Sequence, residues 1–242
     1  MSEPLKTRNV FIDTQVFRSR NFYFGGAAFT GLIKLADKGR VTVYLVDITQ
    51  REIKTQIEEL LEEAKLRFQD FKKKASILFS VEKFRAAFKD FDGEKQGEEV
   101  WGGVEKFIAD AKVKVIPGKI ASIERVFESY FGRKAPFGGG AKKSEFPDAF
   151  VIDTLAQWCA TSDEMMYVVS GDGDFEKACS SHDKLIHLKD IQEFVALVLE
   201  AAICGSTRSA KPFTSKGFWF HLRFRSCSIL PTRGFSTFMN SV

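Results

Sequence analysis

The chain has 242 residues, of which 44% are apolar and 28% charged, and its 25 phenylalanines suffice for one large globular core. No run approaches 18 consecutive apolar residues and the amino end has no signal-peptide pattern, so we expect a cytoplasmic protein without a membrane partner. The net charge of +4 comes from residues 204–242, which hold six basic residues and no acid, so it does not by itself predict a polyanion partner.

Five short runs rich in β-branched residues predict buried strands, and helical patterns lie between them. The strands are expected at 9–13, 41–47, 112–117, 165–170 and 184–188. The helices are expected at roughly 27–38, 50–75, 82–91, 98–110, 120–131, 146–161, 175–181 and 190–203. This alternation predicts an α/β fold with a central, mostly parallel five-stranded sheet, helices on both faces and a ligand crevice beyond the carboxyl ends of the strands.

Three segments do not fit the simple alternation. The block from 50 to 131 carries more helix than one crossover needs, so we expect a helical insertion within about 55–131 of a domain that spans 1–203. Residues 132–143 have the glycine and lysine content of a flexible loop. The basic segment 204–242, rich in Ser and Phe, fits a disordered tail, an irregular appendage or out-of-frame sequence equally well.

The four cysteines form no close pair and accompany only three histidines. They indicate reduced thiols, and neither a zinc site nor a disulfide framework is predicted.

Carboxylates gather where the predicted elements meet the carboxyl edge of the sheet. Asp13 ends the first strand, and the strand at 165–170 runs into Asp172 and Asp174. The helix at 146–161 must begin at the same edge, and its periodicity places Asp148 on the apolar side, with Asp153 and neighbouring polar residues opposite. Glu52, near the start of the helix after strand two, is a further contributor.

Such a cluster requires a counter-charge. Two carboxylates about 4 Å apart repel by roughly 4 kcal/mol at an effective dielectric constant near 20. An oxygen-only set of ligands points to Mg²⁺ or Mn²⁺. Metal ions held in this way activate water for attack on phosphorus, so the pattern predicts phosphodiester hydrolysis.

At this point the sequence resembles a known family. The stretches "VFIDT", "REI", "FPDAFVIDTL" and "SGDGDF" are similar, in order and in position, to the acidic motifs of PIN-domain nucleases, most of all to a larger bacterial PIN-like group. The resemblance covers about residues 9–200 and implies an α/β/α sandwich, Mg²⁺ or Mn²⁺, and cleavage of single-stranded or structured RNA. It implies that Asp13, Glu52, Asp148 and Asp172 form the acidic quartet, that Asp174 is a fifth acid and that Ser170, at a position where the family often has Thr, contacts the substrate.

Each acid also has a structural interpretation. Thr49 and Glu52 are spaced as a capping box, and Asp47 at the end of strand two competes with Glu52 for the metal. Asp148 could be a first-turn acid interacting with the helix dipole. Asp172 and Asp174 could form a turn in which Asp174 caps the next helix.

Basic residues beside Asp148 suggest a place for the substrate. Arg133, Lys134, Lys142 and Lys143 could hold the phosphate backbone, with Phe137 available to stack on a base. A solvated loop is the alternative. The possible partners are RNA, an inhibitor protein and a second copy of the chain.

Two other functions compete with the nuclease. A haloacid-dehalogenase-like phosphatase would explain "VFIDT" and "VVSGDGDF", but the second acid that its mechanism needs is replaced by Gln15. An inactive PIN-like module that binds RNA or protein is expected to have lost some of the acids, all of which are present here.

Overall fold

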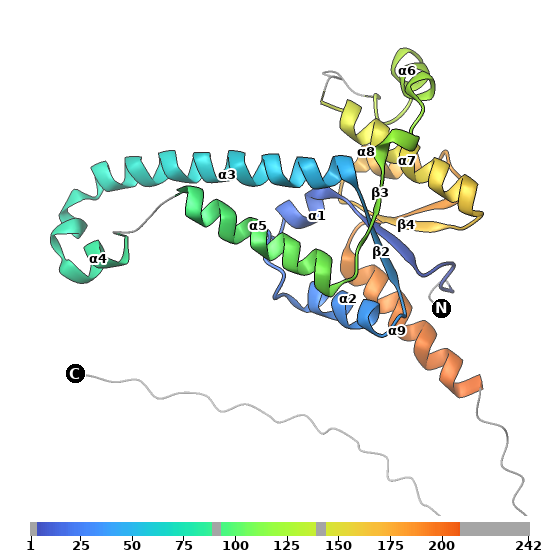
Figure 1. Ribbon diagram of the computed structural model, residues 1–242, viewed down its shortest axis with the longest axis horizontal. Helices are drawn as coiled ribbons and strands as arrows, with labels where there is room; N and C mark the ends of the chain where they lie inside the picture. Colours follow the sequence, from blue (N-terminus) through green and yellow to red (C-terminus); the bar gives the residue numbers. More distant parts are fainter. Residues whose placement is uncertain (1–3, 89–92, 139–143, 209–242) are drawn as a thin grey trace, which may run out of the picture.

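The computed structural model describes residues 4–88, 93–138 and 144–208, and its centre is a five-stranded sheet (Figure 1). The strands are β1 (Asn9–Ile12), β2 (Thr42–Val46), β3 (Lys114–Ile116), β4 (Met166–Val169) and β5 (Leu185–Leu188). Their order is β3-β2-β1-β4-β5, and every pairing is parallel. All five predicted strands are confirmed, as is the α/β class.

Alternate side chains of the strands enter two apolar cores, one on each face of the sheet. On one face Val10 and Ile12 of β1 pack with helices that contribute Phe17, Phe29 and Phe194. On the other face Phe11 packs with side chains of two further helices, among them Leu155. The sheet is therefore covered on both sides, as the near-continuous apolar strands indicate.

The helices lie close to their predicted positions. They are α1 (Thr14–Arg18), α2 (Ala27–Asp37), α3 (Asp47–Lys74), α4 (Glu82–Ala87), α5 (Gly93–Asp110), α6 (Ile123–Phe131), α7 (Phe146–Ser162), α8 (Gly173–Cys179) and α9 (Ile191–Arg208). Two short 3₁₀ turns, η1 (Ser76–Ser80) and η2 (Gly118–Ile120), complete the described part. The sequence patterns did not predict α1 or η1, because single turns are too short to show a helical period. No helix in the described ranges is both long and apolar enough to span a bilayer.

A projecting arm made of the outer part of α3, η1, α4 and the first half of α5 lies within the range where the sequence predicts a helical insertion (Figure 1). The buried residues of α3, of which Ile57 is the last, all lie in its first three turns. Further out, the arm is held by contacts among its own aromatic rings. Those rings belong to Phe68, Phe71, Phe79, Phe84 and Phe88.

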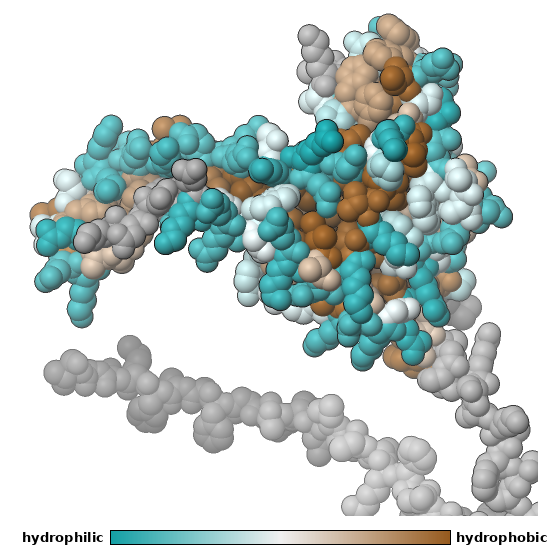
Figure 2. Space-filling view, viewed as in Figure 1, coloured by the Kyte–Doolittle hydropathy of each residue, from teal (hydrophilic) through white to brown (hydrophobic). Residues whose placement is uncertain are grey.

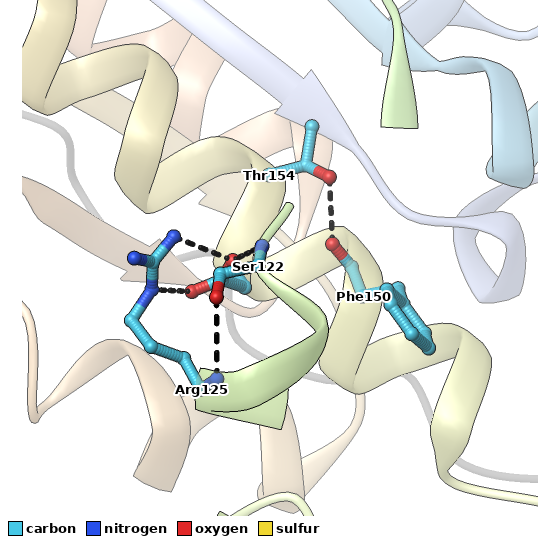
Figure 3. A network of polar contacts seen from close by, with 5 residues as sticks. Ser122, Arg125, Phe150 and Thr154 are labelled. Atoms are coloured by element: carbon cyan, nitrogen blue, oxygen red, sulfur yellow. Dashed lines mark hydrogen bonds and ion pairs between the residues drawn. The ribbon is translucent and has the colours of Figure 1, made fainter. Parts of the chain in front are cut away.

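Helix α7 is buried on both sides, which corrects the prediction that Asp153 and Thr154 lie on a solvated face. Asp153 is only 9% exposed and accepts hydrogen bonds from Ser122 N at 2.6 Å and Arg125 Nε at 2.7 Å (Figure 3). Thr154 is fully buried and donates its hydroxyl to Phe150 O at 2.7 Å. The sequence pattern failed because α6 covers the side of α7 that faces away from the sheet.

The segment after α6 also differs from the expected flexible loop. Phe137 is fully buried in a small core with Val126 of α6 and Ala149 of α7, so it is not available to stack on a base. Residues 139–143, which include Lys142 and Lys143, lie outside the described residues.

Candidate active site

Four carboxylates from separate parts of the chain face a common region at the carboxyl edge of the sheet. Asp13 follows β1, Glu52 lies in the second turn of α3, Asp148 in the first turn of α7, and Asp172 after β4. The charges of Asp13, Glu52 and Asp172 all act on Asp148, and those of Glu52 and Asp172 act on Asp13. The structure thus brings together four of the five acids that the sequence singled out.

Asp13 is held in place from β4. Its side chain is 6% exposed, and its Oδ2 accepts the hydroxyl of Ser170 at 2.7 Å. Burial raises the pKa of Asp13 to about 6, the hydrogen bond from Ser170 opposes that rise, and the charge of Glu52 adds to it. The Ser170 hydroxyl therefore orients Asp13. Because Ser170 is itself fully buried, it is not exposed to a substrate in the way that the sequence analysis expected.

Asp148 is the most strongly perturbed acid of the group. It is half-buried, and this burial is the main reason that its pKa rises to about 8. Repulsion from Asp13, Glu52 and Glu145 adds to the rise. Glu145 immediately precedes α7 and the "FPDAFVIDTL" stretch, and the sequence reasoning missed it.

Glu52 is not a capping residue. Helix α3 begins at Asp47 with Val46 as its N-cap, so the Thr49–Glu52 spacing does not correspond to a capping box. The carboxylate of Glu52 accepts the hydroxyl of Thr14 at 2.9 Å and the amide of Gln56 at 3.1 Å. Thr14, the residue after Asp13, therefore positions a second acid of the cluster.

Asp47, the competitor of Glu52, has a structural role. Its Oδ1 accepts the backbone N–H of Gly118 at 2.7 Å and so ties the start of α3 to the turn that follows β3. A side chain at position 118 would approach this Oδ1 to 2.7 Å, which explains the glycine.

The two aspartates around Gly173 have different environments. Asp172 is the N-cap of α8, and its Oδ1 accepts the backbone N–H of Asp174 at 2.8 Å, so the cap is Asp172 and not Asp174. Asp174 forms an ion pair with Lys177 at 2.8 Å. Asp172 remains available to a cation through its other oxygen, whereas Asp174 already has a positive partner.

The donor chemistry fits a divalent cation. Within the described residues, Asp13, Glu52, Asp148 and Asp172 form no ion pair with lysine or arginine, so their mutual repulsion is not neutralised by the protein there. Over the same residues, no group of three or more His, Cys, Asp or Glu side chains is already arranged so that it could hold a metal ion. Hard oxygen donors of this kind suit Mg²⁺ or Mn²⁺, and binding would have to draw the carboxylates together.

Of the basic residues predicted to hold the substrate, Arg133 and Lys134 are exposed directly after α6. Neither forms an ion pair in the part of the chain that the structure describes. They remain accessible to an anion near the start of α7.

The described residues form an α/β protein in which a parallel sheet lies between two helical layers and carries acidic side chains at its carboxyl edge. A protein-family model described as "PIN domain" matches residues 10–175, well over half of the chain. The chain therefore belongs to the PIN-domain family, as its motifs indicated, and the matched range contains all five predicted acids. No curated protein and no solved structure matches the chain significantly.

Proposed function

We propose that this protein is a Mg²⁺- or Mn²⁺-dependent nuclease and, more specifically, an endoribonuclease. PIN domains are generally nucleases that use divalent metals, which supports the coarser statement. The observation that carries the proposal is the convergence of four carboxylates from four segments without a lysine or arginine partner among the described residues. Membership of this family favours the nuclease over a haloacid-dehalogenase-like phosphatase.

Asp13, Asp148 and Asp172 are the proposed main metal ligands. Glu52 completes the shell of a second ion or positions the attacking water. Asp174 could assist only by giving up its ion pair with Lys177, which makes it the weakest of the five. When bound, the metal would supply the Lewis acidity that activates water and stabilises the leaving oxygen.

The remaining residues of the site act on the acids. The Ser170 hydroxyl fixes the orientation of Asp13, and the Thr14 hydroxyl does the same for Glu52. Asp148, whose pKa is raised to about 8, keeps its proton at neutral pH when no cation is present, and a cation must displace that proton. Exposed Arg133 and Lys134 would attract the phosphates of the substrate.

The test is cleavage of labelled single-stranded RNA and DNA with Mg²⁺, with Mn²⁺ and with chelator. We expect RNA to be cut internally in the presence of metal and Asp148→Asn to abolish cleavage while the fold is retained. Asp37→Asn is the control, because Asp37 is an exposed acid paired with Lys112 at the end of α2. Retained cleavage by Asp148→Asn at saturating Mg²⁺ would refute the assignment. RNA binding without cleavage under any condition would identify an inactive module.

A further inference from the structure

Helix α6 carries apolar residues on its outer side as well as on its inner side. Val126 and Tyr130 face the small core against α7. Ile123, Phe127 and Phe131, spaced four residues apart, are 65%, 42% and 77% exposed. Figure 2 shows this apolar surface over α6, at the top of the view. A surface helix normally has a single apolar stripe, directed at the core, so the outer stripe requires a different explanation.

The outer stripe, which we call the α6 ridge (Ile123, Phe127 and Phe131), lies beside the first turn of α7. The ring of Phe127 lies 5.7 Å from that of Phe146, the first residue of α7 and two positions before Asp148. The rings of Phe127 and Phe131 are 6.1 Å apart and inclined by only 26°, so they present a nearly parallel pair of faces. The ridge therefore borders the start of the helix that carries Asp148.

The ring contacts beneath the ridge hold it in place. Tyr130 and Phe137 meet edge to face at 5.3 Å, and each also contacts Phe146 at 5.0 Å. Arg125 anchors the same helix to α7 through Asp153. The exposed rings are thus carried by a helix that is fixed to the core, and a ligand would find them already positioned.

The charges around the ridge favour an anionic ligand at one end. Arg133 and Lys134 follow Phe131 after a single glycine and are exposed. Glu124 and Glu128 lie along one border of the stripe and would repel phosphates there. A ligand with flat apolar groups and negative charges fits if its apolar groups meet the rings and its charges approach Arg133 and Lys134.

We propose that the α6 ridge stacks unpaired bases of a single-stranded nucleic acid whose phosphates contact Arg133 and Lys134. This inference deepens the proposed function, because it assigns a substrate class and a binding surface to the same site. Unstacked bases offer π-faces to exposed aromatic rings, and basic side chains beside those rings follow the backbone. A duplex keeps its bases stacked internally and cannot use the ridge. Three exposed residues are also too few for a protein interface of ordinary size.

The experiment measures equilibrium binding in chelator, so that no cleavage occurs. The full-length protein is titrated into labelled single-stranded RNA, single-stranded DNA of the same sequence, and the RNA duplex, with fluorescence anisotropy as the readout. Phe127→Ala and Phe131→Ala are each expected to weaken single-strand binding about 10-fold or more and to leave duplex binding unchanged. Ile77→Ala is the matched control, because Ile77 is 78% exposed on the helical arm.

Two substitutions at one position separate stacking from simple apolar contact. Phe131→Trp keeps an aromatic face and should retain affinity, whereas Phe131→Leu keeps apolar area without the face and should lose it. Arg133→Ala should weaken binding and reduce its dependence on salt concentration. The comparison of RNA with DNA shows which nucleic acid the ridge prefers, and either preference supports the proposal that the ridge stacks bases.

Three outcomes would overturn the inference: alanine variants that bind single strands as well as wild type, a leucine variant equal to wild type, or a duplex bound as tightly as a single strand. A wild-type dimer that Phe131→Ala dissociates without a change in RNA affinity would instead identify a self-association surface. Because these measurements contain no metal, they are independent of whether the protein cleaves RNA. Failure of the nuclease proposal and failure of the proposal for the α6 ridge are therefore distinguishable.

Discussion

Replacing Asp148 by asparagine is expected to stabilise the protein when no divalent cation is bound. Burial and the charges of Asp13 and Glu52 raise the pKa of Asp148 from 3.8 to about 8. One pKa unit corresponds to about 1.4 kcal/mol, and pH 7 lies about three units above the pKa of Asp148 in the unfolded chain. At this pH the raised pKa therefore lowers the free energy of unfolding by up to about 4 kcal/mol. Asparagine keeps part of the burial cost, so we expect a gain of about 2 kcal/mol, or about 4–8 °C in Tm.

The pH dependence follows from the sign of the shift. Between about pH 4 and pH 8 the folded state holds the Asp148 proton and the unfolded state does not, so the free energy of unfolding falls as pH rises through this range. Asp13, with its pKa raised to about 6, adds to the fall in the lower half of the range. Asp148→Asn should therefore be less sensitive to pH than wild type.

The assay is thermal or urea unfolding in chelator from pH 5 to pH 8.5. Asp153→Asn, in the same helix, is the matched control and should destabilise the protein, because it weakens the ion pair with Arg125. Mn²⁺ at 100 times its Kd should increase the free energy of unfolding of wild type by about 2.7 kcal/mol and so raise its Tm. The same addition should affect Asp148→Asn much less. An Asp148→Asn protein with the Tm and pH slope of wild type in chelator would refute the account of an unneutralised acidic cluster.

Three further predictions concern the supporting structure. Arg125→Met should lower the free energy of unfolding by about 1–3 kcal/mol in urea titrations, because it leaves the nearly buried Asp153 without its partner; an unchanged midpoint would contradict this. Phe137→Ala should cost about 3–5 kcal/mol of stability, since its ring is fully buried; an unchanged urea midpoint would contradict this. A chain ending at Arg208 should keep the Tm and cleavage rate of the full chain, because it retains Ile191, Phe194 and Val198, the residues through which α9 enters the core. A large fall in Tm would show that the basic segment contributes to the fold.

Strand positions and helix order could be predicted because they depend on local patterns. A β-branched run such as "VTVYLV" is buried on both faces and has few alternatives to a parallel strand. The edge at which the acids meet was also predictable, because parallel strands joined by helices present their carboxyl ends on one side. The family match agrees with the predicted fold.

Errors in the site concern what packs on a helix from outside. Periodicity placed Asp153 on a solvated face, but α6 covers that face and supplies Arg125 as its partner. A glycine-rich context suggested an exposed Phe137, whereas α6 and α7 enclose the ring. The structure instead exposes Phe127 and Phe131 of α6, two residues that the sequence analysis did not single out.

The sequence alone predicted the strands, the longer helices, their order and a set of acids at one edge, because hydrophobic periodicity and chain direction are properties of neighbouring residues. Only the tertiary structure decided which acids are neutralised. Asp153 pairs with Arg125, and Asp174 pairs with Lys177. Among the described residues, Asp13 and Asp148 have no such cationic partner and are repelled by other acids. The physical reason is that a charge depends on groups that approach through space from other elements, and no local pattern records their distance.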